Sequence, residues 1–190
     1  RNVGNTPAPA HHTRDIRVLT SHMRTHGPMS LLDPERLLDD PMYVQRLHHL
    51  RTPVFSYPRL QALRYYIGHH KPDILESYSF WYQPADVTAR YARRHNIPFI
   101  FHPMYYPRHK PTWKLYQQTI GRRTFAATDV VAVISPFEQQ LIEKAGLPVK
   151  RFELIPPGID AARFDRPRLN PFLKRGITGK ILLAASRLAP

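Results

Sequence analysis

The sequence predicts an α/β fold with a Rossmann-like, doubly wound parallel sheet, because short apolar runs alternate with amphipathic segments of helical length. The clearest apolar run, Val130 to Ile134, consists mainly of branched residues, as in a strand that is buried on both faces. Ser135 and Pro136 then predict a helix start, with Ser135 as N-cap and proline at the first helical position. Gly146 ends that helix, and a second strand follows at Phe152 to Ile155. Strand, capped helix and strand together form one βαβ unit.

The same alternation runs through most of the chain upstream of this unit. Asp33 followed by Pro34 predicts another helix start. That helix is expected to be interrupted at Pro41 and to carry Leu37, Leu38, Tyr43, Val44 and Leu47. The remaining strands are predicted at 16–21, 54–57, 71–76 and 99–102, and the remaining helices at 60–70, 84–95 and 112–127. Right-handed crossovers between parallel strands place ligand-binding loops at the carboxyl ends of the strands.

Length and composition limit the class of protein. The chain has 190 residues, which suits one full domain with a real core but not two domains of this type. There is no cysteine, so disulfides and thiolate metal sites are excluded, and a cytoplasmic location is compatible. The apolar runs are too short to span a bilayer.

The net charge of +14 is the most unusual feature of the composition. No acidic residue occurs between Asp86 and Asp129, and aromatic residues are interleaved with the cations of that interval. The stretch from Met104 to Arg123 therefore predicts contact with an anionic membrane surface, through its cations and the rings of Tyr105, Tyr106, Trp113 and Tyr116. The alternative is a solvated helix face whose aromatic residues lie in the core.

The βαβ unit and the turn after it resemble a known family. The matching residues are Ser135, Gly146-Leu147-Pro148, the segment Pro156 to Asp160, and Phe164. This order resembles the retaining glycosyltransferases of family 4, which have the two-domain GT-B fold. Pro157 stands where the family usually has Asn. The resemblance covers about Ile16 to Arg187.

The resemblance implies how the chain is divided. Residues 1–15 form a tail or irregular segment, and 16–164 form the N-terminal, Rossmann-like acceptor-binding domain of a GT-B fold. Residues 165–179 form an interdomain linker, and 180–190 form the first strand of the C-terminal donor-binding domain. This chain alone is therefore expected to be inactive. Whether the strand at 16–21 is the first or the second strand of the family's fold is left open.

The resemblance also implies roles for individual residues. His102, at the carboxyl end of its strand, is the expected catalytic residue and contacts the transferred sugar; the plainer reading is a histidine held by a backbone partner. Arg187 is expected to bind the donor diphosphate, for which a bidentate guanidinium is suited. Glu76 and Tyr78 are expected to line the acceptor cleft. The residues expected to shape the interdomain turn are Gly158 and Asp160.

The reaction implied is transfer of a sugar from a nucleotide-sugar to an acceptor, with retention at the anomeric carbon. No metal and no cofactor besides the donor substrate are expected, and the acceptor is lipid-linked or a saccharide. The expected location is cytoplasmic, peripheral on the membrane. Two alternatives stay open: a basic nucleic-acid-binding module and a non-catalytic remnant of the fold. No recognised nucleic-acid motif is present, so a nucleic-acid partner is not expected.

Overall fold

The computed structural model of the 190-residue chain describes residues 15–21, 44–50, 57, 59–158, 160–163, 172 and 175–179. The chain divides into two compact units, Arg1–Pro156 and Pro157–Pro190. The predicted helix start at Asp33 lies outside the described residues, as does the predicted strand at 54–57 except for Tyr57. The boundary expected after Phe164 stays a prediction.

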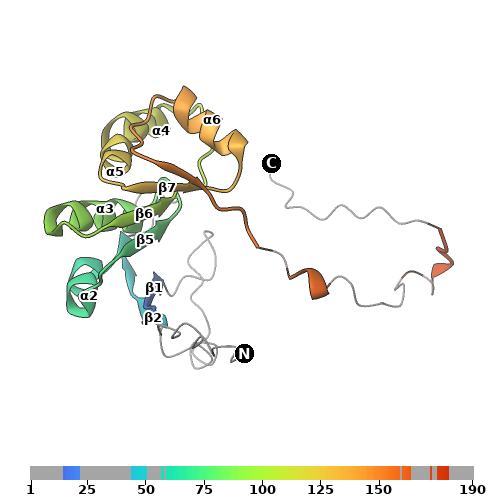
Figure 1. The fold of residues 1–190 in the computed structure, drawn as a ribbon, viewed down its shortest axis with the longest axis horizontal. Coiled ribbons are helices and arrows are strands. Elements are labelled where there is room, and N and C mark those ends of the chain that lie inside the picture. The colour runs from blue at the N-terminus through green and yellow to red at the C-terminus, as the bar shows by residue number, and fades with distance from the viewer. Residues whose placement is uncertain are drawn as a thin grey trace, which may run out of the picture. The chain divides into compact units, whose positions relative to one another are not determined.

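A four-stranded parallel sheet forms the centre of the first unit, which confirms the predicted α/β, Rossmann-like fold class (Figure 1). Its strands, in spatial order, are β5 (Leu75–Tyr78), β6 (Phe99–His102), β7 (Val130–Val133) and β8 (Phe152–Leu154). Two smaller sheets are the parallel pair β1 (Val18–Ser21) with β2 (Val44–Leu47) and the antiparallel pair β3 (His49–Leu50) with β4 (Arg59–Leu60).

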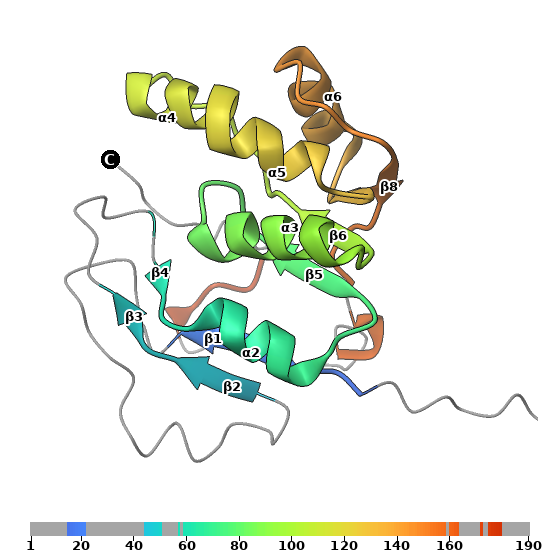
Figure 2. The same ribbon diagram turned by 90° about the vertical axis from the view of Figure 1, so that its left-hand side faces the viewer.

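The helices of the first unit are α2 (Leu63–His70), α3 (Gln83–His95), α4 (Pro111–Tyr116), α5 (Arg122–Ala126) and α6 (Pro136–Lys144). A π-helical segment, η1 (Gln117–Gly121), joins α4 to α5, and a short 3₁₀ helix, η2 (Ala161–Arg163), lies in the second unit. Two views at right angles show α2, α3 and α4–α5 on one side of the sheet (Figures 1 and 2). Right-handed crossovers that step in one direction along a sheet place successive helices on the same face.

The sheet therefore has one packed face and one partly open face. Alternate side chains on the helix side are buried: Leu75, Ser77, Phe99, Phe101, Val131 and Val133. The small buried residues of α3, Ala85, Ala89 and Ala92, let that helix approach the sheet closely. The opposite face carries the more exposed residues of the central strands, among them Glu76, Tyr78, Ile100 and His102.

Both ends of α6 follow the predicted capping. The Ser135 hydroxyl accepts a hydrogen bond from the Glu138 backbone N–H (3.2 Å), and Gly146 adopts a left-handed conformation with φ of 63°. The N–H groups of Gly146 and Leu147 bond to the carbonyls of Glu143 and Ile142, which is a Schellman ending. The Glu138 carboxylate does not bond to the Ser135 N–H in a capping box but accepts from the N–H groups of Ile134 and Tyr105. It thereby ties the start of α6 to the loop after β6.

Two predictions about local structure are wrong. Val44 and Leu47 belong to strand β2 and not to a helix, because their backbone pairs in parallel with β1. The helix predicted to start at Leu60 starts at Leu63, since Leu60 pairs with β3 and Ala62 adopts a left-handed conformation with φ of 54°. Sequence periodicity does not report such pairing between distant segments.

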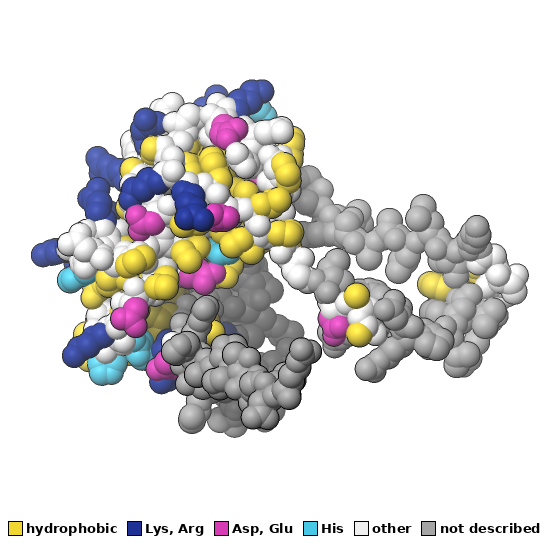
Figure 3. Space-filling view, in the orientation of Figure 1, with side chains coloured by type: hydrophobic (Ala, Val, Ile, Leu, Met, Phe, Trp, Pro, Cys, Tyr) yellow, Lys and Arg dark blue, Asp and Glu magenta, His cyan; other side chains and the backbone are white. Residues whose placement is uncertain are grey.

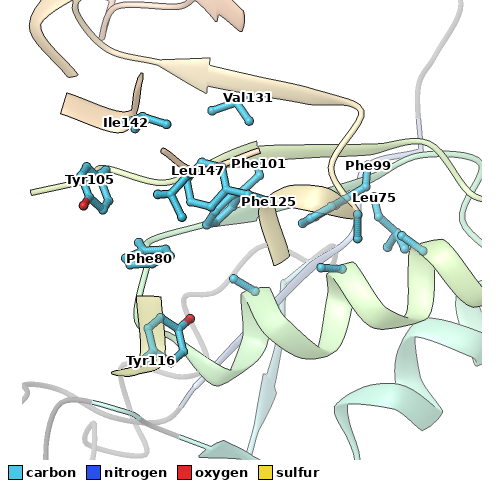
Figure 4. Packing of buried hydrophobic residues seen from close by; sticks show 14 of the residues in the cluster. Leu75, Phe80, Phe99, Phe101, Tyr105, Tyr116, Phe125, Val131, Ile142 and Leu147 are labelled. Atoms are coloured by element: carbon cyan, nitrogen blue, oxygen red, sulfur yellow. The ribbon is translucent and has the colours of Figure 1, made fainter. Parts of the chain in front are cut away.

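The predicted helix 112–127 is continuous but contains the π-helical segment. One extra residue in the π turn rotates the helix, so Gly121 is buried while Ile120 is 38% exposed. Gly121 faces the ring of Phe80, which packs edge-on against Tyr105, Trp113 and Tyr116. Figure 4 shows Phe80 between Tyr105 and Tyr116. The missing side chain at Gly121 therefore lets the loop after β5 dock on this helix.

Substitution of Gly121 by alanine is expected to destabilise the first unit by about 1–3 kcal/mol, because the added methyl group overpacks the core. Its Cβ would lie 2.5 Å from Phe80 Cζ and 3.2 Å from Tyr116 Cε1, and both rings are buried. Urea unfolding of Gly121→Ala measures the loss. Gly158→Ala is the control, because its Cβ would meet no atom within 4 Å. Equal stability of the two variants would contradict this packing.

Candidate functional site

Three side chains that the sequence singled out meet on the open face of the sheet. Strands β5 and β6 pair in parallel, and their register places Tyr78 beside His102, the last residues of the two strands. His102 Nε2 lies 2.8 Å from Glu76 Oε1, and the Tyr78 hydroxyl donates to the same oxygen at 2.6 Å. The carboxyl ends of two neighbouring strands thus bring together an imidazole, a carboxylate and a phenol, which we call the Glu76–Tyr78–His102 cluster.

Hydrogen bonding fixes the protonation of this cluster. An ionised carboxylate only accepts hydrogen bonds, so both Nε2 of His102 and the Tyr78 hydroxyl carry protons. The hydrogen bond to Glu76, together with partial burial and the charge of Glu76, raises the pKa of Tyr78 to about 12. The phenol therefore stays a neutral donor at physiological pH. The two rings stack with centroids 4.5 Å apart and planes 17° apart.

The cluster is accessible but held in place. The side chain of His102 is 12% exposed and that of Glu76 is 46% exposed. Tyr78 is 56% exposed, so one face of its ring is open although the other covers His102. An accessible carboxylate, a protonated phenol and a flat ring are suited to bind a ligand that carries hydroxyl groups.

The loops that follow β5 and β6 have unusual backbone conformations. Ser79, Trp81 and Met104 have φ values of 71°, 68° and 48°, a left-handed region that non-glycine residues seldom adopt. The strand pairing continues past His102, because Ser79 N–H donates to the His102 carbonyl and Phe80 N–H to the Pro103 carbonyl. Strained backbone of this kind concentrates at functional sites. No glycine or asparagine marks these positions, so nothing in the sequence predicts them.

The buried carboxylate of Asp86 links the helices that pack against the loop after β5. Asp86, in the first turn of α3, accepts hydrogen bonds from the hydroxyls of Tyr57 (2.6 Å), Tyr116 (2.8 Å) and Thr124 (2.6 Å). Burial raises the pKa of Asp86, although the three hydroxyl donors act in the opposite direction. These bonds join α3 to α4 and α5, and the Tyr116 ring packs edge-on against Phe80 and Trp81. Sequence reasoning missed this network, since an acidic residue in a first helical turn is usually exposed.

The other predicted site residues lie elsewhere. Arg187 is outside the described residues. Gly158 and Asp160 lie in the second unit and are exposed, and Gly158 has open space around it and no left-handed φ. A larger residue would therefore fit at position 158, both in the space available and in its backbone conformation. Within the described part of the chain, no group of three or more His, Cys, Asp or Glu side chains could hold a metal ion. Metal independence stays a prediction.

Comparison with protein families identifies the chain. The model of Glycosyltransferase Family 4 matches residues 13–163, which is most of the chain. The chain therefore belongs to glycosyltransferase family 4, as its turn and βαβ motifs predicted. No curated protein matches it.

Proposed function

We propose that this chain forms the acceptor-binding half of a transferase that moves a sugar from a nucleotide-sugar to an acceptor with retention. The observation that carries the proposal is the Glu76–Tyr78–His102 cluster, at the carboxyl edge of a parallel sheet in a family 4 glycosyltransferase. Ligands of open α/β sheets bind at this edge. The nucleic-acid-binding alternative has no comparable observation in its favour.

Each member of the cluster has a proposed role. His102 contacts the transferred sugar near the reacting carbon. Glu76 accepts a hydrogen bond from an acceptor hydroxyl through its exposed carboxylate, and Tyr78 packs its open ring face against the apolar face of a sugar ring. Arg187 holds the donor diphosphate, where a guanidinium stabilises the charge that develops on the leaving group. The reaction requires no metal and no cofactor besides the donor.

A transfer assay tests this function. A transferase that unites this chain with its donor-binding half is incubated with a panel of nucleotide-sugars and with saccharide or lipid-phosphate acceptors, and the anomeric configuration of each product is read by proton NMR. The proposal predicts transfer with the donor's anomeric configuration kept. Product of inverted configuration would refute retention, and consumption of donor without any dependence on an acceptor would refute transfer.

The 190-residue chain by itself is expected to turn over no nucleotide-sugar. The resemblance assigns only Arg187 of this chain to the donor diphosphate, so the diphosphate has few partners. Release of free nucleotide from each nucleotide-sugar measures turnover, and His102→Ala of the same length is the control. Turnover above that control would contradict the prediction.

We also propose that the protein works at the cytoplasmic face of an anionic membrane. The structure corrects the residues expected to contact lipid, because Tyr105, Trp113 and Tyr116 are buried and belong to the core. The exposed apolar side chains of this stretch are Met104, Tyr106, Leu115 and Ile120. No described helix is long and apolar enough to cross a bilayer, so any attachment through this stretch would be peripheral.

Basic side chains surround these exposed apolar residues. Arg108, Lys110, Lys114, Arg122 and Arg123 are all exposed. Lys and Arg side chains gather over the part of the surface where α4 and α5 lie (Figure 3). Arg108 also lies over the Trp113 ring, 5.2 Å from its centroid. Cations near an anionic bilayer are attracted by about 1 kcal/mol each, so five of them support reversible binding.

Vesicle co-sedimentation tests the membrane proposal. The protein is expected to bind vesicles with anionic lipid at low salt, to bind neutral vesicles poorly, and to be released by high salt. The double variant Lys110→Glu with Lys114→Glu should lose binding. The matched control, Arg93→Glu with Arg94→Glu on α3, makes the same charge change at exposed positions and should keep it. Equally poor binding to both vesicle types at low salt would refute the proposal.

A further inference from the structure

Glu76 is placed to control which nitrogen of His102 faces a ligand. Its Oε1 lies 2.8 Å from Nε2 of His102, and a carboxylate cannot donate a hydrogen bond. Nε2 therefore carries its proton whether the imidazole is neutral or charged. The nitrogen that exchanges a proton or accepts a hydrogen bond is then Nδ1, since the partner of one ring nitrogen sets the state of the other.

Among the described residues that flank His102 on β5 and β7, Glu76 is its charged partner. Strand β5 presents Glu76 and Tyr78 on this face. On the other side, β6 pairs with β7 through Ile100 with Val130 and Phe101 with Val131, and the next residue of β7, Ala132, is small and uncharged. Because no described side chain of β7 competes for the imidazole, the orientation of the ring depends on β5.

Tyr78 contacts both Glu76 and His102 but does not take the place of Glu76 as the hydrogen-bond partner of the imidazole. Its hydroxyl bonds to the same carboxylate oxygen at 2.6 Å, and its ring stacks on the imidazole. The hydroxyl therefore holds Glu76, while the ring restricts rotation of His102. A phenylalanine at position 78 would keep the stack and remove only the hydroxyl, which makes Tyr78→Phe a matched control.

We propose that Glu76 is a positioning residue. It holds Nε2 of His102 in a hydrogen bond within the protein and leaves Nδ1 to bind a hydroxyl-bearing ligand. The identity of that ligand rests on the proposed function, but the positioning itself does not. A neutral His102 then accepts a hydrogen bond at Nδ1 from a hydroxyl group. A protonated His102 donates one from the same atom. Without Glu76, the imidazole can rotate and exchange its two nitrogens.

NMR of the imidazole tests the positioning directly. In the ¹⁵N-labelled chain, the Nε2 proton of His102 is expected to give a hydrogen-bonded resonance that is protected from exchange. The resonance should persist in Tyr78→Phe and disappear in Glu76→Ala, while the methyl resonances of the core stay unchanged. A His102 protonated at Nδ1 alone, or a protected Nε2 proton in Glu76→Ala, would overturn the proposal.

Kinetics of the transferase supply a second readout. Glu76→Ala is expected to lower kcat by about 10- to 100-fold, as removal of the groups that orient functional histidines does elsewhere, with little change in KM for the donor. Tyr78→Phe should lose much less. Normal kcat in Glu76→Ala would overturn the positioning role and leave the proposed function intact. Absence of transfer by the unsubstituted transferase, with its donor-binding half present, would instead refute the proposed function, and the NMR result would then decide the inference alone.

Discussion

Asp86→Ala is expected to destabilise the first unit by about 3–5 kcal/mol, the range for removing one partner from a buried polar network. The carboxylate of Asp86 is 6% exposed and accepts from three hydroxyls, two of them on the buried residues Tyr116 and Thr124. Those donors would lose their acceptor, and a cavity would remain between α3 and α5. Urea unfolding followed by circular dichroism measures the change. A loss below about 1 kcal/mol would mean that the network contributes little.

The isosteric variant Asp86→Asn separates charge from shape. Asparagine keeps one acceptor oxygen, and the hydroxyls can turn to accept from its amide, so a smaller loss is expected.

Because burial raises the folded-state pKa of Asp86 above 3.8, the folded protein binds this proton more tightly than the unfolded chain. The contribution of Asp86 is then greatest below pH 3.8 and is lost as pH rises through the folded-state pKa. The wild type should therefore gain stability relative to Asp86→Asn on acidification from neutral pH, and the opposite trend would contradict a raised pKa.

His102→Ala is expected to reduce kcat/KM for sugar transfer by about 100-fold or more, in a transferase that unites this chain with its donor-binding half. His102 is the only member of the cluster proposed to contact the transferred sugar, and nothing beside it in β6 or β7 could replace an imidazole. The variant should fold normally, because the histidine lies on the open face of the sheet and not in the core between sheet and helices.

His95→Ala is the matched control for this experiment. His95 is exposed at the end of α3, away from the cluster's strands, and its removal should leave transfer unchanged. Thermal unfolding of both variants separates loss of function from loss of structure. Retention of more than half of the wild-type kcat/KM in a folded His102→Ala variant would remove His102 from the reaction.

Local sequence patterns were sufficient for the central part of the fold. The strand Phe99–His102 was predicted with its observed bounds, and α6 was predicted with its caps, because apolar runs and capping residues act over a few positions. The same reasoning placed His102 at the end of a strand that lies between two others in the parallel sheet. Register then brought Glu76 and Tyr78 to it, which alternation along a strand makes predictable once two strands are neighbours.

Features that depend on distant contacts could not be predicted. The π-helical turn exists where Gly121 meets Phe80, and the Asp86 network joins residues that are 29 to 38 positions apart. The choice of Val44–Leu47 as a strand depends on pairing with β1. The burial of Trp113 and Tyr116 favours the interpretation of their helix as one with its aromatic residues in the core. In each case the residue that determines the local structure lies farther along the chain than the short segment over which hydrophobic periodicity is read.

Chemical-shift mapping of acceptor binding tests directly whether the Glu76–Tyr78–His102 cluster lies in the acceptor-binding site. The ¹⁵N,¹³C-labelled chain is titrated with an acceptor that the transfer assay has identified. The largest shifts are expected at Glu76, Tyr78 and His102 and at the loops after β5 and β6. Glu76→Ala is expected to weaken binding, because it removes the carboxylate proposed to accept from an acceptor hydroxyl. Shifts confined to α2 and α3, with the Glu76–Tyr78–His102 cluster unperturbed at saturation, would contradict it.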